Sequence, residues 1–513
     1  MPPVTPPAPL RFSFLAKLAA AALLVAAGDA MLYGFEGGSI IGAFGVLWLA
    51  VMVLARPAVR RARGGWIAIG CAALFAAICV IEPWPLPMML FLAAIGSAAL
   101  LARHVFDNAL LWAVRLGLLG LRAPLGAAGD LWRLASLPGR SGTSAAALVL
   151  MNLVLPLAGG ALFLSLFASA NPVLGQALGA FRLPDMTTVI LHAILMVVIL
   201  GFTWPTLRPR ALRLAGGEWA LARRLPDPPV TMALVTLGVF NAVFALENAL
   251  DIAFLWSGAP LPEGVTLAEY AHQGAYTLIA TALLAGLFVL VALRPGGVLA
   301  RHAGVRRLVL AWVAQNVLLV ASSMLRLADY IAAYSLTEWR IAALGWMVLV
   351  ASGLMLVCWR FLTGKSLAWL INANAIAAGI ALTLAAAVDL GAVAARWNVD
   401  NLRDPAKLDM CYLDRLDGAA IIPLIELARA PVAPAMQDRA LYLAHQARAN
   451  LEQRQADWQA WTLRGAWRLA RAGALLEGDT RVPAPAPHSR GCGGEILPAP
   501  FTTSPALTPQ ENP

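Results

Sequence analysis

The sequence predicts an all-α protein: a polytopic transmembrane helical bundle of about 11 spans with a small helical C-terminal domain and a disordered tail. Of its 513 residues, 60% are hydrophobic and only 13% are charged, whereas soluble proteins carry about 25% charged residues. Apolar blocks of roughly 17–24 residues recur along the chain, which is the length a helix needs to cross the hydrocarbon layer of a membrane. Arginines are concentrated in the short loops between these blocks.

The apolar blocks define the spans in order along the chain. The first block resembles a secretory signal, but Lys17 interrupts it and further blocks follow, so we expect an uncleaved first span. The fourth block is short, which is compatible with a tilted span or with an interfacial helix. The predicted spans cover residues 14–33, 39–55, 65–81, 88–102, 145–168, 187–204, 230–250, 275–293, 306–326, 341–363 and 367–388.

The loops predict the orientation in the membrane. Clusters of arginine follow the second, fourth, sixth and eighth spans, and Arg360 and Lys365 lie at the end of the tenth. The intervening loops contain only Arg182, Arg326 and Arg340. Because basic loops stay in the cytoplasm, we expect a cytoplasmic N-terminus. With an odd number of spans, we expect the C-terminal region to lie outside, in the periplasm of a Gram-negative cell, and the protein to belong to a bacterial inner membrane. One miscounted span would place the C-terminal region in the cytoplasm.

The chain divides into regions by its hydrophobic pattern. After Leu390 charged residues and short amphipathic runs replace the apolar blocks, which predicts a small helical extramembrane domain. From about Thr480 the chain is rich in proline, alanine and glycine, as disordered tails are. The predicted regions are a four-span region at 1–102, a cytoplasmic amphipathic, interfacial segment at 103–144, a seven-span core at 145–390, the helical domain at 391–478 and the tail at 479–513.

Composition and motifs exclude several functions. The net charge of +10 arises from loop arginines, so it predicts no binding of nucleic acid. The five cysteines form no CxxC motif and no cluster with histidine, so the sequence predicts neither a metal nor another cofactor. Walker, HExxH, GxSxG and Rossmann motifs are absent. These absences favour a protein that is not an enzyme, and no catalytic residue is assigned.

A polar cluster in two spans is the candidate site. Charged and amide side chains are costly inside a membrane, at roughly 2.5–3.5 kcal/mol for a central charge. On a helical wheel, Gln315, Ser322, Arg326 and Asp329 fall within about 60° of one another. Arg326 departs from the charge rule, and we expect Glu247, Asp251 or Asp329 to neutralise it. The full predicted cluster is Asn241, Glu247, Asn248, Asp251, Glu269, Tyr270, His272, Gln315, Ser322, Arg326, Asp329 and Tyr330.

Other polar residues within spans have simpler interpretations. Asn372 and Asn374 are expected to form hydrogen bonds between helices, and Asp389 marks the end of the last span. His192 lies inside a span and is interpreted as a packed histidine rather than a ligand.

Several stretches resemble a known family: FASANPVLGQAL at 167–178, NAVFALENALDIAFLW at the start of 241–286, RLADYIAAYSLTEWRIAALGWM at 326–347, WLINANAIA at 369–377 and RWNVDNL at 396–402. They are similar to bacterial multi-pass membrane proteins classified as domain of unknown function forty-one seventy-three, akin to forty-one fifty-three. The resemblance covers roughly residues 140–430. It implies no reaction, cofactor or catalytic residue. Asn171 stands where that family usually has an acidic residue, which argues against a required carboxylate there. The recognisable segments contain Asn171, Glu247, Asp251, Glu269, Tyr270, His272, Arg326, Tyr334 and Arg340.

Three functions follow as hypotheses. The first is a non-enzymatic sensor, assembly factor or transporter-like scaffold, whose polar cluster binds a protein partner or small ligand on the extracytoplasmic side. The second is a secondary transporter of a small solute, although no internal repeat supports it. The third is a membrane enzyme similar to lipid-linked glycosyltransferases, in which Asp29 and Glu36 near the first outer loop would act. The lipid bilayer is a partner in all three.

Overall fold

The computed structural model shows a helical protein. Every element among the residues that it describes is a helix, so the predicted all-α class is confirmed. The described residues are 9–122, 186–209, 229–257, 298–402, 408–481 and the isolated positions 126, 129, 130, 159, 160, 163, 164, 167, 170, 171 and 492.

Two compact units make up the chain. Unit 1 comprises Met1–Ala215 and Asp457–Leu463, and unit 2 comprises Gly216–Ala456 and Arg464–Pro513. The helix predicted at 187–204 belongs to unit 1.

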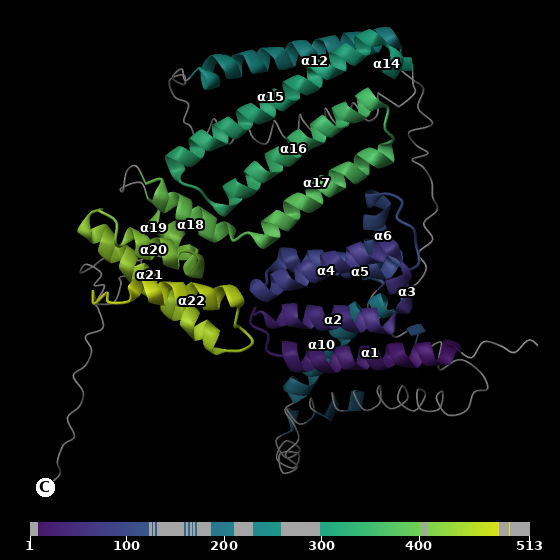
Figure 1. The fold of residues 1–513 in the computed structure, drawn as a ribbon, viewed down its shortest axis with the longest axis vertical. Helices are drawn as coiled ribbons and strands as arrows, with labels where there is room; N and C mark the ends of the chain where they lie inside the picture. Colours follow the sequence, from purple (N-terminus) through teal and green to yellow (C-terminus); the bar gives the residue numbers. More distant parts are fainter. Residues whose placement is uncertain are drawn as a thin grey trace, which may run out of the picture. The chain divides into compact units, whose positions relative to one another are not determined.

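Unit 1 is a bundle of helices (Figure 1), and its core contains aliphatic, aromatic and small side chains. Its helices pack closely where glycine permits it: a methyl group at Gly42 would collide with the backbone of Val80 on the neighbouring helix. The described helices are α1 (Pro9–Leu32), α2 (Ile40–Ala55), α3 (Pro57–Arg61), α4 (Arg63–Ile81), α5 (Pro85–Leu101), α6 (Ala109–Leu121) and α10 (Met186–Leu207).

Arg56 joins three helices at one end of unit 1. It follows α2 directly, and its side chain is only 4% exposed. Its guanidinium donates to the carbonyls of Thr206 in α10, at 2.5 Å, and of Ala99 in α5, at 3.1 Å. A cation is favourable at helix C-termini, where carbonyls lack partners. The residue that the sequence places in a basic loop is therefore a buried cap on two helices.

The opposite end of unit 1 contains backbone pairing between distant segments. The amide of Gly38 donates to the carbonyl of Gln459 at 2.9 Å, and the amide of Ser39 donates to Trp461 at 2.7 Å. Gly38 is required there, because a Cβ atom would collide with the Gln459 carbonyl. The segment Asp457–Leu463 thus lies beside the start of α2.

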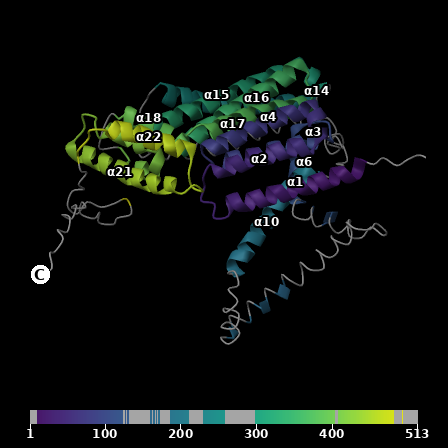
Figure 2. The ribbon, with the colours of Figure 1, turned by 60° about the horizontal axis from the view of Figure 1, so that its bottom comes forward.

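Unit 2 contains a layer of long apolar helices, α12, α15, α16 and α17, which neighbour one another in that order (Figures 1 and 2). The helices α18 to α22 form a second group at one end of this layer. The helices are α12 (Val230–Asp251), the π-helical turn η1 (Ile252–Trp256), α14 (Val298–Arg301), α15 (Ala303–Tyr334), α16 (Glu338–Thr363), α17 (Leu367–Ala387), α18 (Leu390–Asp400), α19 (Met410–Arg415), the 3₁₀ turn η3 (Asp417–Ala419), α20 (Ile421–Leu427), α21 (Pro434–Ala456) and α22 (Leu463–Leu476).

α12 and α15 run in the same direction. Their hydrogen-bonded partners keep a nearly constant separation in sequence: 67 residues for Asn241 and Leu308, 67 for Asn248 and Gln315, and 75 for Asp251 and Arg326. Ser257 and Val298 therefore lie at opposite ends of the pair. The span predicted at 275–293 lies outside the described residues.

The helices α18 to α22 form a core of their own, in which Ile421, Leu424, Ile425 and Leu441 are almost fully buried. They cover the region predicted to be a helical domain. Asp389 links this domain to the last span: its carboxylate accepts from the amide of Ala392 at 3.0 Å, which caps α18, and forms an ion pair with Arg468 of α22.

The long helices identify a membrane protein. Six described helices have the length and apolar composition to cross a membrane: α4, α10, α12 with η1, α15, α16 and α17. The predicted spans at 14–33, 39–55 and 88–102 correspond to α1, α2 and α5, whereas the one at 145–168 lies largely outside the described residues.

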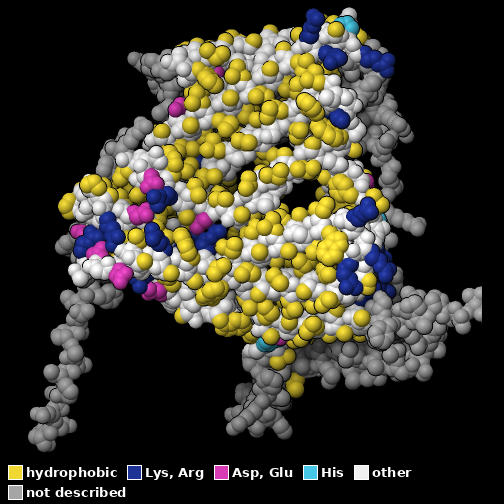
Figure 3. Space-filling model, viewed as in Figure 1, with side chains coloured by type: hydrophobic (Ala, Val, Ile, Leu, Met, Phe, Trp, Pro, Cys, Tyr) yellow, Lys and Arg dark blue, Asp and Glu magenta, His cyan; other side chains and the backbone are white. Residues whose placement is uncertain are grey.

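Exposed side chains agree with a bilayer around these helices. Exposed tryptophans lie near helix ends, including Trp66 and Trp84 in unit 1 and Trp339 and Trp359 in unit 2, as at membrane interfaces. Hydrophobic side chains cover the visible flanks of the helices, and basic ones gather beside α14 and the start of α15 (Figure 3).

Candidate functional site

A row of polar contacts connects α12 to α15 within the apolar layer of unit 2. Gln315 donates its Nε2 to Asn241 Oδ1 at 2.9 Å. Asn241 Nδ2 in turn donates to the carbonyl of Leu308 at 3.0 Å, and Asn248 Nδ2 donates to the carbonyl of Gln315 at 3.4 Å. Asn241 and Asn248 are seven residues apart on α12, and their acceptors Leu308 and Gln315 are seven residues apart on α15. The contacts therefore lie on one face of each helix.

The charged part of the cluster lies where α12 ends. Arg326 of α15 forms an ion pair with Asp251, and its Nη2 is 3.8 Å from Glu247 Oε1. The side chains of Arg326 and Asp251 are 8% and 2% exposed, whereas that of Glu247 is 46% exposed. The predicted proximity of Arg326 to Glu247 and Asp251 is therefore confirmed.

The π-helical turn η1 follows Asp251 directly. Such turns interrupt an α-helix and are frequent at functional sites. Here the turn brings Trp256 back to α15, where its Nε1 donates to Ser322 Oγ at 3.0 Å. The predicted residue Ser322 is fully buried and belongs to the contact surface between the helices.

The remaining predicted residues have other positions. Asp329 is exposed, and Tyr330 lies beneath the guanidinium of Arg340, 4.4 Å from its ring centre. Glu269, Tyr270 and His272 lie outside the described residues.

The turn between α15 and α16 carries a second set of contacts, which the sequence analysis missed. Asn398 of α18 is 5% exposed and forms two hydrogen bonds with the backbone of Leu336. Its Oδ1 accepts from the amide at 2.6 Å, and its Nδ2 donates to the carbonyl at 2.9 Å. A reciprocal pair of this kind fixes α18 to the turn. In the sequence, Asn398 is an asparagine on a short amphipathic helix, and this pattern does not predict which residue it contacts.

Tyr412 and Arg340 also form hydrogen bonds with the backbone around the turn between α15 and α16. The amide of Glu338 donates to the Tyr412 hydroxyl at 3.0 Å. Burial raises the pKa of the Tyr412 phenol above its ordinary value of 10.0, so the hydroxyl is neutral at physiological pH. Arg340 donates to the carbonyl of Tyr334 at 2.6 Å. Arg326 and Arg340, which both depart from the predicted charge pattern, are thus bound to partners at the same end of unit 2.

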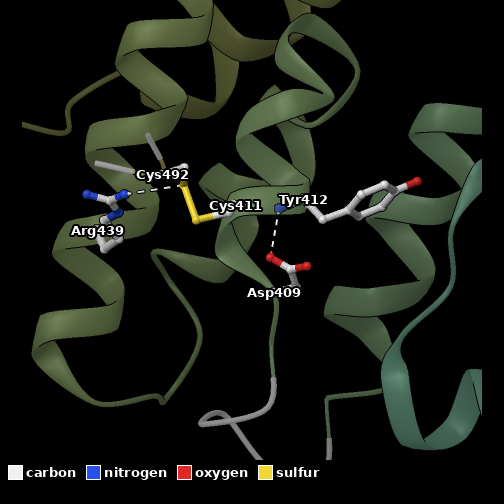
Figure 4. Close-up of a disulfide and its surroundings, with 5 residues drawn as sticks. All are labelled: Asp409, Cys411, Tyr412, Arg439 and Cys492. Carbon is white, nitrogen blue, oxygen red and sulfur yellow. Dashed lines mark hydrogen bonds between the residues drawn. A yellow bond between two sulfur atoms is a disulfide. The ribbon is translucent and has the colours of Figure 1, made fainter. Parts of the chain in front are cut away.

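A disulfide joins Cys411 of α19 to Cys492 (Figure 4). Arg439 Nη2 lies 3.9 Å from Cys492 Sγ, and Asp409 caps α19 by accepting from the amide of Tyr412 at 2.9 Å. No motif in the sequence predicted this bond between Cys411 and Cys492. Their separation of 81 residues matches no motif, so spacing could not reveal the bond.

Asp29 and His192 pair in unit 1. His192 Nδ1 lies 2.8 and 2.9 Å from the two carboxylate oxygens of Asp29, and Tyr33 stacks on the imidazole with ring centres 3.6 Å apart. A carboxylate fixes the orientation of the histidine ring in this way. His192 is therefore paired as well as packed, while Glu36, the other acid of the enzyme hypothesis, is exposed.

Comparisons with known proteins give a family but no activity. Searches of curated proteins and of solved structures found no match to this chain. The family described as "Domain of unknown function (DUF4153)" matches residues 41–427, more than half of the chain. This range contains α12, α15 and the polar cluster, and it agrees with the expected kinship to family forty-one fifty-three. The protein belongs to the DUF4153 family of domains of unknown function.

Proposed function

We propose that this membrane protein is a non-enzymatic sensor or assembly scaffold of a bacterial inner membrane. The polar cluster between α12 and α15 responds to a ligand, and the helical domain α18–α22, on the extracytoplasmic side, changes in response. The N-terminus is cytoplasmic. The observation that carries the proposal is the pair of hydrogen bonds between Asn398 and Leu336, because it attaches the domain to the turn that directly follows α15, the helix that bears Arg326.

Two observations support the extracytoplasmic side for the domain. Structural disulfides such as Cys411–Cys492 persist in oxidising compartments such as the periplasm. In unit 1, Asp457–Leu463 pairs with Gly38 and Ser39, which follow the first span, at the end opposite the arginine-capped helices. If basic loops are cytoplasmic, this end is extracytoplasmic.

Reporter fusions test the orientation. Alkaline phosphatase fused after Arg481 is expected to be active, because that enzyme needs an oxidising compartment. The matched fusion after Arg122, in the predicted cytoplasmic segment, is expected to be inactive. Activity after Arg122 and none after Arg481 would reverse the proposed topology.

Contact geometry supports the link between cluster and domain. Arg326 and Tyr334, the last residue of α15, are eight residues apart, and the helix rise of 1.5 Å per residue puts them about 12 Å from each other. The intervening residues are continuous helix as far as Tyr334. A rigid helix can transmit a shift at Arg326 to the turn that Asn398 and Tyr412 hold.

Hydrogen–deuterium exchange on the purified full-length protein tests this link. Asn398→Ala is expected to accelerate exchange in α18 by about tenfold, because two buried hydrogen bonds are lost. Asn401→Ala is the matched control, since the exposed Asn401 donates only to Trp397 within its own helix. Asp251→Asn is expected to alter exchange in α18 as well. If exchange in α18 is unchanged in both Asn398→Ala and Asp251→Asn, the proposed link between the polar cluster and the helical domain is wrong.

A further inference from the structure

Two buried oxygen atoms on α12 have no hydrogen-bond partner. They are Asp251 Oδ2 and Asn248 Oδ1. The two residues are 1% and 5% exposed. They are three positions apart, so they share one helix face. Buried acceptors without donors are rare in proteins, because each loses its hydrogen bonds to water and gains none in exchange.

Neighbouring contacts explain why these two atoms are the ones left over. Asn248 uses its Nδ2 to donate to the carbonyls of Phe244, at 2.8 Å, and Gln315, which leaves Oδ1 as its unused atom. Asp251 uses Oδ1 for Arg326 and leaves Oδ2. The side chains are thus held so that both free atoms are acceptors.

The charge of the cluster is unbalanced. Arg326 contributes one positive charge, whereas Asp251 and Glu247 contribute two negative charges when both are ionised. These three described side chains therefore carry a formal net charge of −1, with the buried Asp251 carboxylate beside Arg326 and the Glu247 carboxylate at the exposed rim. One additional positive charge would neutralise it, and low-dielectric surroundings strengthen that attraction.

The available ligands determine which cation fits. Carboxylate and amide oxygens are hard ligands that prefer hard cations over transition metals. A calcium ion needs six to eight oxygens and usually several carboxylates. Among the described residues no group of three or more acidic, histidine or cysteine side chains could hold a metal. A single surplus negative charge matches a monovalent cation better than a divalent one, which usually binds several carboxylates.

We propose that Asp251 Oδ2 and Asn248 Oδ1 bind an alkali-metal cation, Na⁺ or K⁺, with Glu247 at the exposed rim. This inference rests on the proposed function, because it names the ligand to which the sensor or scaffold responds. Arg326 holds Asp251 in place and is not itself a ligand of the cation.

Thermal unfolding of the full-length protein in detergent tests the binding. At equal ionic strength, the unfolding temperature is expected to rise with NaCl or KCl relative to choline chloride, because a ligand that binds only the folded state stabilises it. The NaCl and KCl series identify which ion binds. Asn248→Leu is expected to weaken the apparent affinity by about tenfold, as loss of one ligand does. Asn374→Leu is the control, since Asn374 donates to Leu370 within α17.

Identical curves in all three salts would overturn the cation site. An Asn248→Leu variant with an unchanged cation response would overturn the assignment of the ligands. Exchange in α18, measured with and without the cation, separates this inference from the proposed function. Cation binding without any change of exchange in α18 supports the cation site and contradicts the proposed sensor function. A missing cation response beside an intact effect of Asn398→Ala contradicts only the site.

Discussion

Replacing Arg326 by methionine is expected to destabilise the protein by about 3–5 kcal/mol, because the buried carboxylate of Asp251 then loses its ionic partner. Asp251 is 1% exposed and cannot turn to water. Glu247 is half exposed, so its carboxylate remains solvated and contributes little to the loss. The expected result is a large drop in the midpoint of thermal or detergent-induced unfolding of the purified protein, followed by circular dichroism.

Two further variants isolate the ion pair. Arg306→Met removes an exposed arginine from the same helix, and its midpoint is expected to stay close to that of the natural protein. Arg326→Met combined with Asp251→Leu is expected to recover most of the lost stability, since an apolar pair of similar size avoids the buried charge altogether. If Arg326→Met lowers the unfolding midpoint no more than Arg306→Met does, the ion pair does not stabilise the contact between α12 and α15.

Sequence periodicity could predict this cluster because its members follow helix geometry. Glu247 and Asp251 are four residues apart, and Arg326 stands alone as a basic residue at the far end of its span. Helix faces are set by the rotation of about 100° per residue, so these positions could be assigned before the fold was known. The same reasoning predicted the spans, whose length and apolar composition are dictated by the membrane.

Contacts between segments far apart in sequence could not be predicted in this way. Arg56 matches the basic-loop pattern, but its burial depends on the ends of α5 and α10 meeting beside it. Asn398 looks like any exposed amide until α18 folds back on the α15–α16 turn. Periodicity gives the face of one helix and contains no information on which distant backbone that face meets.

Replacing Cys411 and Cys492 together by serine is expected to destabilise the helical domain by about 2–4 kcal/mol, because the disulfide restricts the unfolded chain over a separation of 81 residues. The measurement is the unfolding midpoint of the domain, which is followed by exchange in α19–α21 under increasing denaturant. Cys358→Ser is the control: that cysteine is free and lies in the span α16, so its loss is expected to leave the domain unchanged.

Thiol counting decides whether the bond exists in the cell. In protein denatured without reductant, a polyethylene-glycol maleimide is expected to add at Cys71, Cys79 and Cys358 only, and after reduction it adds at all five cysteines. Five additions without reductant would show that Cys411 and Cys492 are reduced, as thiols in the cytoplasm are. Because the same bond supports the extracytoplasmic placement of the domain, that result would contradict both the disulfide's contribution to stability and the proposed orientation.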